Sequence, residues 1–110
     1  MKIAVDLDHT LCIPNDQSTD SEEKYGQAKP ILGMIERVNA FYEEGSHITI
    51  YTARRMLTHN GNIQKVINDV GKITEDWLQR YGVKYHELVF GKIYYDLLID
   101  DKSMRPEEFE

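Results

Sequence analysis

Two carboxylates one residue apart follow the first apolar run of the chain, and two adjacent carboxylates follow the last one. The first pair is Asp6 and Asp8, and the second is Asp100 and Asp101. Such apolar runs indicate buried parallel strands, whose carboxyl ends meet at one edge of a sheet. Four carboxylates gathered there would repel and desolvate one another, so they need a counter-charge. The pattern predicts a hard divalent cation with oxygen ligands, Mg²⁺.

Two further polar side chains follow apolar runs between these pairs. Thr52 ends a β-branched and aromatic run at residues 47–51, and Lys92 follows the run at residues 87–90. Ligands of open α/β sheets bind outside the carboxyl ends of the strands. Taken alone, either residue would more often be an ordinary surface residue. Together with an aspartate nucleophile and an acid pair they indicate phosphoryl transfer.

The elements that must position these groups alternate along the chain. We expect strands at about residues 2–7, 47–52, 87–90 and 96–100, and a helix from Pro30 to just before Gly45. A second helix begins near residue 63 and is interrupted by Gly71, and Thr74 is the expected N-cap of a third. This alternation predicts an α/β fold with a parallel sheet in one domain, residues 1–110. We expect the tail from residue 104 to be poorly packed.

Composition narrows the class of partner. The 110 residues carry a formal net charge of −6, which argues against nucleic acid as a partner, because nucleic acid is usually bound by a basic face. Cys12 is the single cysteine, so an internal disulfide is impossible, and we expect it to be buried near the site. The apolar runs are too short to span a membrane, and no signal peptide is evident. A cytoplasmic protein with a small phosphorylated substrate and no membrane partner is therefore expected.

The order Asp-x-Asp-x-Thr, strand-Thr, Lys, strand-Asp-Asp resembles the haloacid dehalogenase (HAD) superfamily of phosphohydrolases. The segments at residues 48–54, 61–63, 85–92 and 99–102 further resemble the small capless HAD phosphatases associated with capsular polysaccharide biosynthesis. The resemblance implies a three-layer Rossmann-like core with about four parallel strands in the order 3-2-1-4. Residues 11–29 and 91–95 are too few for an inserted cap, so we expect an open site and, from exposed sheet edges, a homo-oligomer.

The resemblance also implies roles for the matching residues. Asp6 would be the nucleophile that forms an aspartyl-phosphate, and Asp8 the general acid and then the general base. Thr52 and Lys92 would be catalytic by holding phosphoryl oxygens of the substrate.

The Mg²⁺ site implied by the resemblance draws on both acid pairs. Its ligands would be Asp6, Asp8 through its backbone carbonyl, and the pair Asp100 and Asp101. By family analogy Asp101 is the direct ligand.

Other residues are candidates for substrate binding. His9 stands where the commonest family pattern has glycine, and it would lie beside the leaving group. Thr10, just beyond the first acid pair, is a further candidate. Arg54 binds either a substrate phosphate or a carboxylate of the protein, and both interpretations stay open. Tyr94 and Tyr95 are expected to pack around the last strand rather than to line a sugar-binding surface.

The sequence thus predicts a Mg²⁺-dependent phosphomonoesterase acting on a sugar phosphate or a similar metabolite, in a pathway such as capsule or surface polysaccharide biosynthesis. A nucleotide or polynucleotide-end phosphatase is the enzyme alternative. The non-enzyme alternatives are a phosphoacceptor module and a degenerate phosphate-binding module whose site is blocked by His9. Receiver-type phosphoacceptors carry their acid pair on the first strand, and here the Asp-x-Asp motif ends that strand, which favours the phosphatase.

Overall fold

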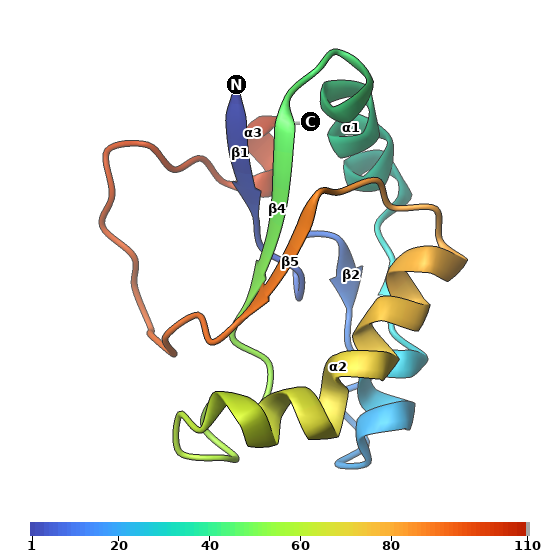
Figure 1. The fold of residues 1–110 in the computed structure, drawn as a ribbon, viewed down its shortest axis with the longest axis vertical. Helices are drawn as coiled ribbons and strands as arrows, with labels where there is room; N and C mark the ends of the chain where they lie inside the picture. Colours follow the sequence, from blue (N-terminus) through green and yellow to red (C-terminus); the bar gives the residue numbers. More distant parts are fainter. Residues whose placement is uncertain (110) are drawn as a thin grey trace.

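A parallel sheet of three strands forms the centre of the computed structural model, which describes residues 1–109. The strands are β1 (Lys2–Val5), β4 (His47–Thr52) and β5 (Glu87–Phe90), in the order β1-β4-β5 (Figure 1). Both neighbouring pairs are parallel. The α/β class and the position and order of the first three expected strands are therefore confirmed.

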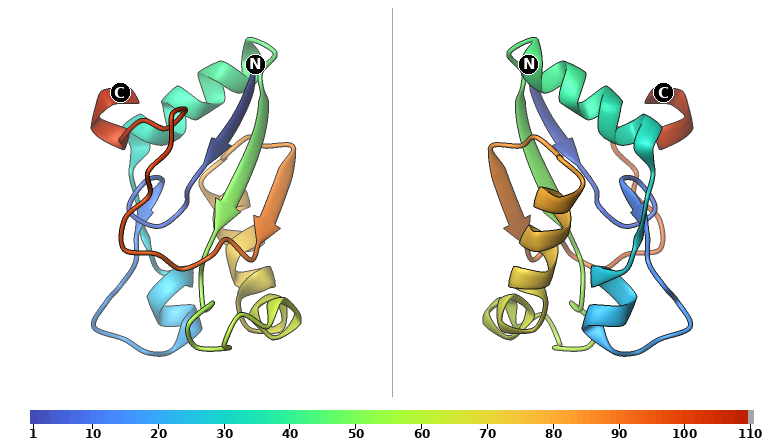
Figure 2. Two further views of the ribbon diagram at one scale, coloured as in Figure 1. Left: turned by 90° about the vertical axis from the view of Figure 1, so that its left-hand side faces the viewer. Right: turned by 90° about the vertical axis from the view of Figure 1, so that its right-hand side faces the viewer.

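One face of this sheet is covered and the other is not. Along β4, Ile48, Ile50 and Thr52 point inward and are buried, while the alternate residues are half-buried. α1 (Leu32–Glu43) and α2 (Ile63–Arg80) both lie on the buried side (Figure 2). Right-handed crossovers that step across the sheet in one direction place successive helices on the same face. The described residues therefore form two layers, and the expected third layer is not present among them.

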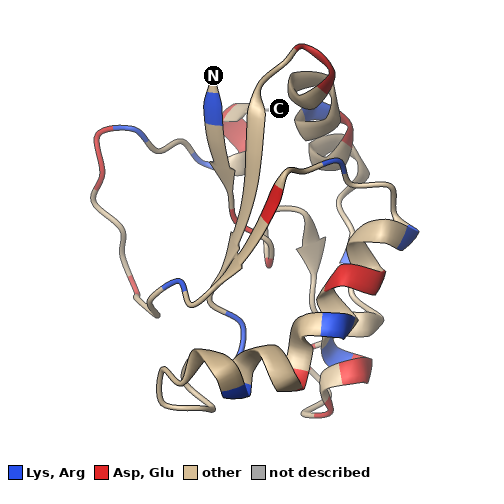
Figure 3. Cartoon of the chain, viewed as in Figure 1, with Lys and Arg blue, Asp and Glu red and all other residues tan. Residues whose placement is uncertain are grey.

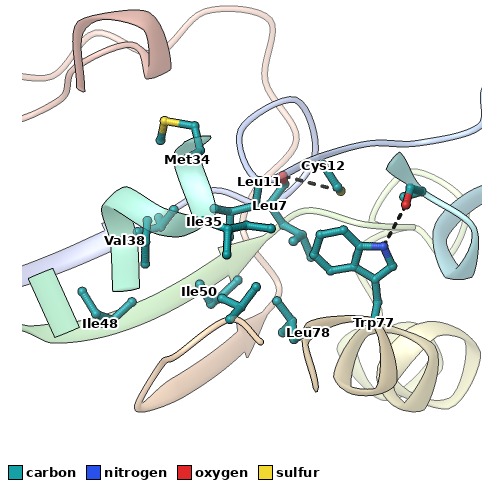
Figure 4. Packing of buried hydrophobic residues seen from close by; sticks show 13 residues of the cluster. Leu7, Leu11, Cys12, Met34, Ile35, Val38, Ile48, Ile50, Trp77 and Leu78 are labelled. Atoms are coloured by element: carbon teal, nitrogen blue, oxygen red, sulfur yellow. Dashed lines mark hydrogen bonds between the residues drawn. The ribbon is translucent and has the colours of Figure 1, made fainter. Parts of the chain in front are cut away.

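The core lies between α1, α2 and the sheet, and Trp77 is its largest member (Figure 4). Its indole Nε1 donates a hydrogen bond to the backbone carbonyl of Ala28 at 2.9 Å, and both residues are buried. A buried indole needs such a partner, since an unpaired polar group away from water costs about 1–3 kcal/mol. This bond joins α2 to the segment that leads into α1.

The helix α2 is continuous where two helices were expected. Asn62 caps it, accepting a hydrogen bond from Lys65 N at 3.1 Å. Gly71 lies inside the helix, where glycine costs only about 1 kcal/mol relative to alanine. Burial of the flanking apolar face, including Val70, outweighs that cost. The expected break at Gly71 and the N-cap at Thr74 were wrong.

The segment after β1 has more structure than the expected surface loop. β2 (Cys12–Ile13) pairs antiparallel with β3 (Lys29–Pro30), so Pro30 lies in a strand and the helix begins two residues later. Between them η1 (Glu22–Gly26), one π-helical turn, packs against α2. No separate cap domain is formed by residues 1–109.

The expected fourth strand is not formed. Residues 91–105 leave β5 as an extended loop on the side of the sheet opposite α1 and α2 (Figures 1 and 2). Within it Ile99 is 89% exposed, and the carboxylate of Asp100 accepts a hydrogen bond from Lys102 N, its own neighbour. Apolar, β-prone residues form a strand only where a neighbouring strand and a covering layer receive them. Both are lacking here, and β1 pairs on one side only within the described part of the chain.

The C-terminal residues pack better than expected. α3 (Pro106–Phe109) rests on α1, with the Phe109 and Phe41 ring centroids 5.2 Å apart and Arg37 above both rings. Glu110, the last residue of the tail, lies outside the described residues. No helix in residues 1–109 has the length and apolarity to cross a membrane. The homo-oligomer stays a prediction.

Candidate functional site

A cavity of about 500 Å³ opens where β1, β4 and β5 end. It brings together six of the nine candidate site residues, namely Asp6, Asp8, His9, Thr52, Arg54 and Lys92, and the pair Asp100 and Asp101 lies outside it. Thr10 is the candidate missing from this wall: its backbone N–H donates to Leu7 O in the turn below. Residues from three strand ends thus line one cavity, as expected for a ligand site at the carboxyl edge of a parallel sheet.

Asp6 and Lys92 face each other across the cavity, with Lys92 Nζ 3.6 Å from Asp6 Oδ1. Burial raises the pKa of Asp6, and the nearby Lys92 charge opposes this without cancelling it. Burial lowers the pKa of Lys92, but a hydrogen bond with Tyr95 and the charge of Asp6 outweigh it, so the net shift is upward. The pair is therefore a carboxylate that is costly to ionise beside a firmly protonated amine.

A glycine positions Lys92. Gly91 has φ +96°, a conformation that residues with a Cβ rarely adopt, and a Cβ there would lie 2.8 Å from Ile63 Cδ1. The chain turns at this point, and Lys92 N then donates to Thr52 O at 3.2 Å. The Gly-Lys dipeptide thus fixes where the ammonium enters the cavity.

Asp8 is held by Arg54 through a fork of hydrogen bonds. Arg54 Nε donates to Asp8 Oδ1 and Oδ2 at 3.1 and 3.0 Å, and Nη2 donates to Oδ1 at 2.9 Å. Arg54 Nη1 donates to Thr74 Oγ1 at 2.9 Å, and Nη2 lies 3.5 Å from Cys12 Sγ. The Arg54 side chain is 0% exposed, whereas that of Asp8 is 23% exposed. Of the two interpretations of Arg54 left open by the sequence, the structure has the carboxylate contact.

Thr52 lies between these two pairs on the middle strand. It is 1% exposed, and its Oγ1 accepts a hydrogen bond from Arg54 N at 3.1 Å. A hydroxyl that accepts through a lone pair still has its own proton to donate. Thr52 therefore retains one donor for an oxygen atom bound in the cavity.

Tyr25 is a site residue that sequence reasoning missed. Its ring lies 4.5 Å from Arg54 Cζ and 5.2 Å from Arg55 Cζ, and it forms part of the cavity wall. Burial raises the pKa of its phenol. A lone tyrosine in a polar segment carries no sequence signal for this role, because only the fold of η1 against α2 brings it to the sheet edge.

The segment that carries Tyr25 is tied to α2 by a second polar cluster. Ser21 Oγ donates to Asp69 Oδ1 at 2.5 Å, and His59 Nε2 lies 2.9 Å from Asp69 Oδ2. Arg55 donates to Thr19 O at 2.7 Å. Burial raises the pKa of Asp69, but the hydrogen bonds from Ser21 and His59 lower it by more, so the net shift of this pKa is downward. The cluster fixes residues 19–25 against the helix that also holds Thr74.

Two residues of the cavity wall have left-handed backbone conformations. His9 has φ 64° and Arg55 has φ 59°. Non-glycine residues in this region are strained by about 1–2 kcal/mol, and such strain concentrates at functional sites. A glycine at the position of His9 would adopt this φ without strain.

The acids described here do not make a metal site. Asp100 and Asp101 lie exposed in the loop after β5, and Asp8 is taken up by Arg54. Within residues 1–109, no group of three or more His, Cys, Asp or Glu side chains is placed to hold a metal ion. The Mg²⁺ site expected from the two acid pairs is therefore not assembled, because the predicted strand that would carry the second pair to the sheet edge is not formed.

The cavity is nevertheless rich in positive charge. Its wall includes four basic side chains, Lys24, Arg54, Arg55 and Lys92, against two acidic ones, in a protein of formal net charge −6. Figure 3 shows basic residues where the chain leaves β4 and β5, and both basic and acidic residues over the rest of the fold. The counter-charges for Asp6 and Asp8 are thus Lys92 and Arg54. The other two basic groups, Lys24 and Arg55, lie 3.6 and 3.7 Å from the carboxylates of Asp16 and Asp69, which are outside the cavity wall.

Apolar and aromatic side chains form the rest of the rim. Tyr94 and Tyr95 both line the cavity, and Lys92 Nζ lies 5.1 Å from the Tyr95 ring centroid. The expectation that these tyrosines pack around a last strand was wrong, since that strand is not formed. Leu57 and Ile93 are exposed apolar members of the same rim. Cys12, by contrast, is fully buried, as expected, and burial raises its pKa to about 12.

Comparison with known proteins gives one strong match. A crystal structure described only as a target from Vibrio cholerae is 35% identical in sequence to this chain and superposes with a TM-score of 0.86. The match covers 98% of this chain and 85% of that one. No family model and no curated protein matches the chain. The match therefore bears on fold and family and names no activity.

Proposed function

We propose that this chain, which belongs to the same family as the Vibrio cholerae protein, is a phosphomonoesterase of the HAD superfamily. The proposed substrate is a sugar phosphate or a similar small metabolite, as in capsule or surface polysaccharide biosynthesis. The proposed intermediate is a phosphorylated Asp6.

One observation carries the proposal. A carboxylate, a hydroxyl and an ammonium from three strand ends, Asp6, Thr52 and Lys92, line one cavity with more basic than acidic side chains. Such a cavity attracts a phosphate dianion while presenting a carboxylate to it. Lys92, 3.6 Å from Asp6, offsets the repulsion between that carboxylate and the phosphate.

The proposed reaction has two displacements. In the first, an oxygen of Asp6 attacks phosphorus and the ester P–O bond breaks. The leaving oxygen takes a proton from Asp8 and departs as the alcohol. In the second, a water oxygen attacks the phosphorus of the aspartyl-phosphate and gives a proton to Asp8. The bond between phosphorus and Asp6 breaks, and inorganic phosphate leaves. Thr52 and Lys92 hold phosphoryl oxygens throughout.

Mg²⁺ binding is part of the proposal only if the loop that carries Asp100 and Asp101 changes its position. The acids present at the cavity do not fit a divalent cation as they stand, and Asp100 and Asp101 lie outside it. Docking of residues 96–100 along the free edge of β1 would bring the second acid pair to the end of the sheet. The apolar residues Leu97, Leu98 and Ile99, now exposed, would gain cover in the same movement.

The experiment is a phosphate-release screen with and without Mg²⁺ across sugar phosphates, nucleotides and 3′- or 5′-phosphorylated DNA ends. We expect release from a sugar phosphate, and none from that substrate by Asp6→Asn. The matched control is Asp76→Asn, the same change at an exposed acid of α2 that is outside the cavity wall. Activity that survives Asp6→Asn refutes the nucleophile.

Other results of the screen would select the alternatives. Preference for DNA ends or nucleotides would replace the substrate class. A stable phospho-Asp6 without hydrolysis of any ester would indicate a phosphoacceptor module. Phosphate binding without chemistry that is converted to turnover by His9→Gly would indicate a degenerate site blocked by His9.

A further inference from the structure

Arg54 is a buried guanidinium with no face open to a substrate. Its side chain is 0% exposed, and its donors are directed to Asp8, Thr74 and Cys12. One face of the guanidinium lies 4.5 Å from the Tyr25 ring centroid. These bonds use four of the five N–H groups of the guanidinium, and its complete burial keeps it from a phosphate in the cavity.

The fork treats the two oxygens of Asp8 differently. Oδ1 accepts from Nε and Nη2 of Arg54, and the Sγ of Cys12 lies 3.4 Å from it. Oδ2 accepts only the Nε bond, at 3.0 Å. A carboxylate oxygen offers about two lone pairs, so Oδ1 is saturated and Oδ2 retains one for a proton. The exposed part of Asp8 lies in the cavity wall, where such a proton would be exchanged.

We propose that Arg54 is a positioning residue that holds the Asp8 carboxylate so that Oδ2 exchanges the proton with the leaving group and with water. This rests on the proposed phosphatase function. Arg54 itself is anchored by Thr74 of α2 and by the Tyr25 ring of η1, so α2 and η1 hold the group that fixes the Asp8 carboxylate.

Arg54→Lys tests the fork. Lysine keeps the charge but presents a compact ammonium that cannot form two parallel bonds to a carboxylate. We expect kcat for a sugar phosphate to fall on the order of 10²-fold, the scale of a misplaced catalytic group, with KM changed less than about threefold. The matched control is Arg37→Lys, which alters an exposed arginine bound to Phe109 O outside the cavity wall and should leave kcat unchanged.

Pre-steady-state kinetics with p-nitrophenyl phosphate separate a positioning role from a structural one. Nitrophenolate leaves without much help from an acid, so the first displacement should survive in Arg54→Lys while the second, which needs Asp8 as base, slows. The expected signature is a burst of about one nitrophenolate per enzyme and a phospho-Asp6 peptide detected by mass spectrometry, as expected also for Asp8→Asn.

Thr74→Val provides an independent variant if Arg54→Lys folds poorly. It removes the acceptor of Nη1 without touching the cavity wall or any charge, and we expect the same burst with a loss of turnover on the order of tenfold. A fall of burst and turnover together, in proportion to the folded fraction, would overturn the proposal and leave a structural ion pair. A raised KM with normal kcat would overturn it in favour of substrate binding. If the wild-type protein is inactive, in contrast, the phosphatase proposal itself is refuted, and the proposed role of Arg54, which depends on it, is refuted as well.

Discussion

Loss of Asp8 and loss of Arg54 should reduce the free energy of unfolding by different amounts, because the two side chains differ in burial. Arg54→Met leaves the Asp8 carboxylate unpaired, but that side chain is 23% exposed and water can partly replace the lost donors. Asp8→Ala leaves a guanidinium that is 0% exposed without its acceptor. Breaking a buried ion pair costs about 3–5 kcal/mol, so we expect about 3 kcal/mol for Arg54→Met and about 4–5 kcal/mol for Asp8→Ala.

The double variant completes the thermodynamic cycle. Asp8→Ala with Arg54→Met leaves neither charge buried, so its cost should be smaller than the sum of the single costs by roughly 2 kcal/mol or more. Urea unfolding followed by the fluorescence of Trp77, the single tryptophan, measures this directly, because that side chain is fully buried. With a slope of about 1–3 kcal/mol per molar urea, the single variants should shift the midpoint by at least about 1 M.

An exposed ion pair supplies the control. Lys72 and Asp76 lie 3.3 Å apart on α2, with side chains 86% and 51% exposed, and Asp76→Ala should cost less than about 0.5 kcal/mol. Equal costs for Arg54→Met and Asp8→Ala would contradict the assigned difference in burial. Additive costs in the double variant would show that the two side chains do not interact in solution.

Three more predictions follow from other parts of the molecule. His9→Gly should leave the stability unchanged or raise it by up to about 1 kcal/mol, because glycine relieves the left-handed strain. His9→Val should lower the stability by at least about 1 kcal/mol. Thermal unfolding of both variants tests this, and equal stabilities would contradict the φ of 64°. Because the pKa of Asp6 is raised above 3.8 and the nucleophile must be ionised, kcat/KM should fall as the pH drops through that raised pKa. Lys92→Gln should move this acid limb to still higher pH, since the Lys92 charge lowers the pKa of Asp6, and an unmoved limb would refute the coupling. Millimolar Mg²⁺ should slow amide hydrogen exchange in residues 96–101 and in β1, with Asp100→Asn combined with Asp101→Asn as the control, and equal exchange with and without Mg²⁺ would remove the docking of this loop from the proposal.

Much of the sheet could be predicted because its strands satisfy local and tertiary demands together. β4 alternates isoleucine with polar or aromatic residues, and one face of it is buried as that pattern requires. The run at residues 96–100 has equally good local character, but a strand also needs an adjacent edge and a covering layer. A short-range pattern cannot report whether those are present, and the expected fourth strand failed for that reason.

The residues of the candidate site also divide into those that the sequence could place and those that it could not. Asp6, Thr52 and Lys92 directly follow strands, so the sheet alone brings them together and the sequence could place them. Tyr25 and Thr74 reach the site from η1 and from the middle of α2. Because α2 continues through Gly71, Thr74 lies on the helix that also packs in the core. Their contribution depends on contacts of Arg54 with residues about 20 to 30 positions away in the chain, to which no periodicity in the sequence corresponds.

The aspartates at the sheet edge have different counter-charges in the structure from the one that the sequence predicts. Four carboxylates at one edge would require a cation, but the structure has two there, and each already faces a basic side chain of the chain itself. The missing acid pair and the unpaired edge of β1 in the described residues arise from the same segment, residues 91–105, which lies away from β1. If Mg²⁺ binds, one movement of that segment would supply both the acids and a neighbouring strand for that edge. Part of the binding energy of the ion would then be spent on ordering the loop, so its apparent affinity should rise in any variant that favours the docked loop, even one far from the acids.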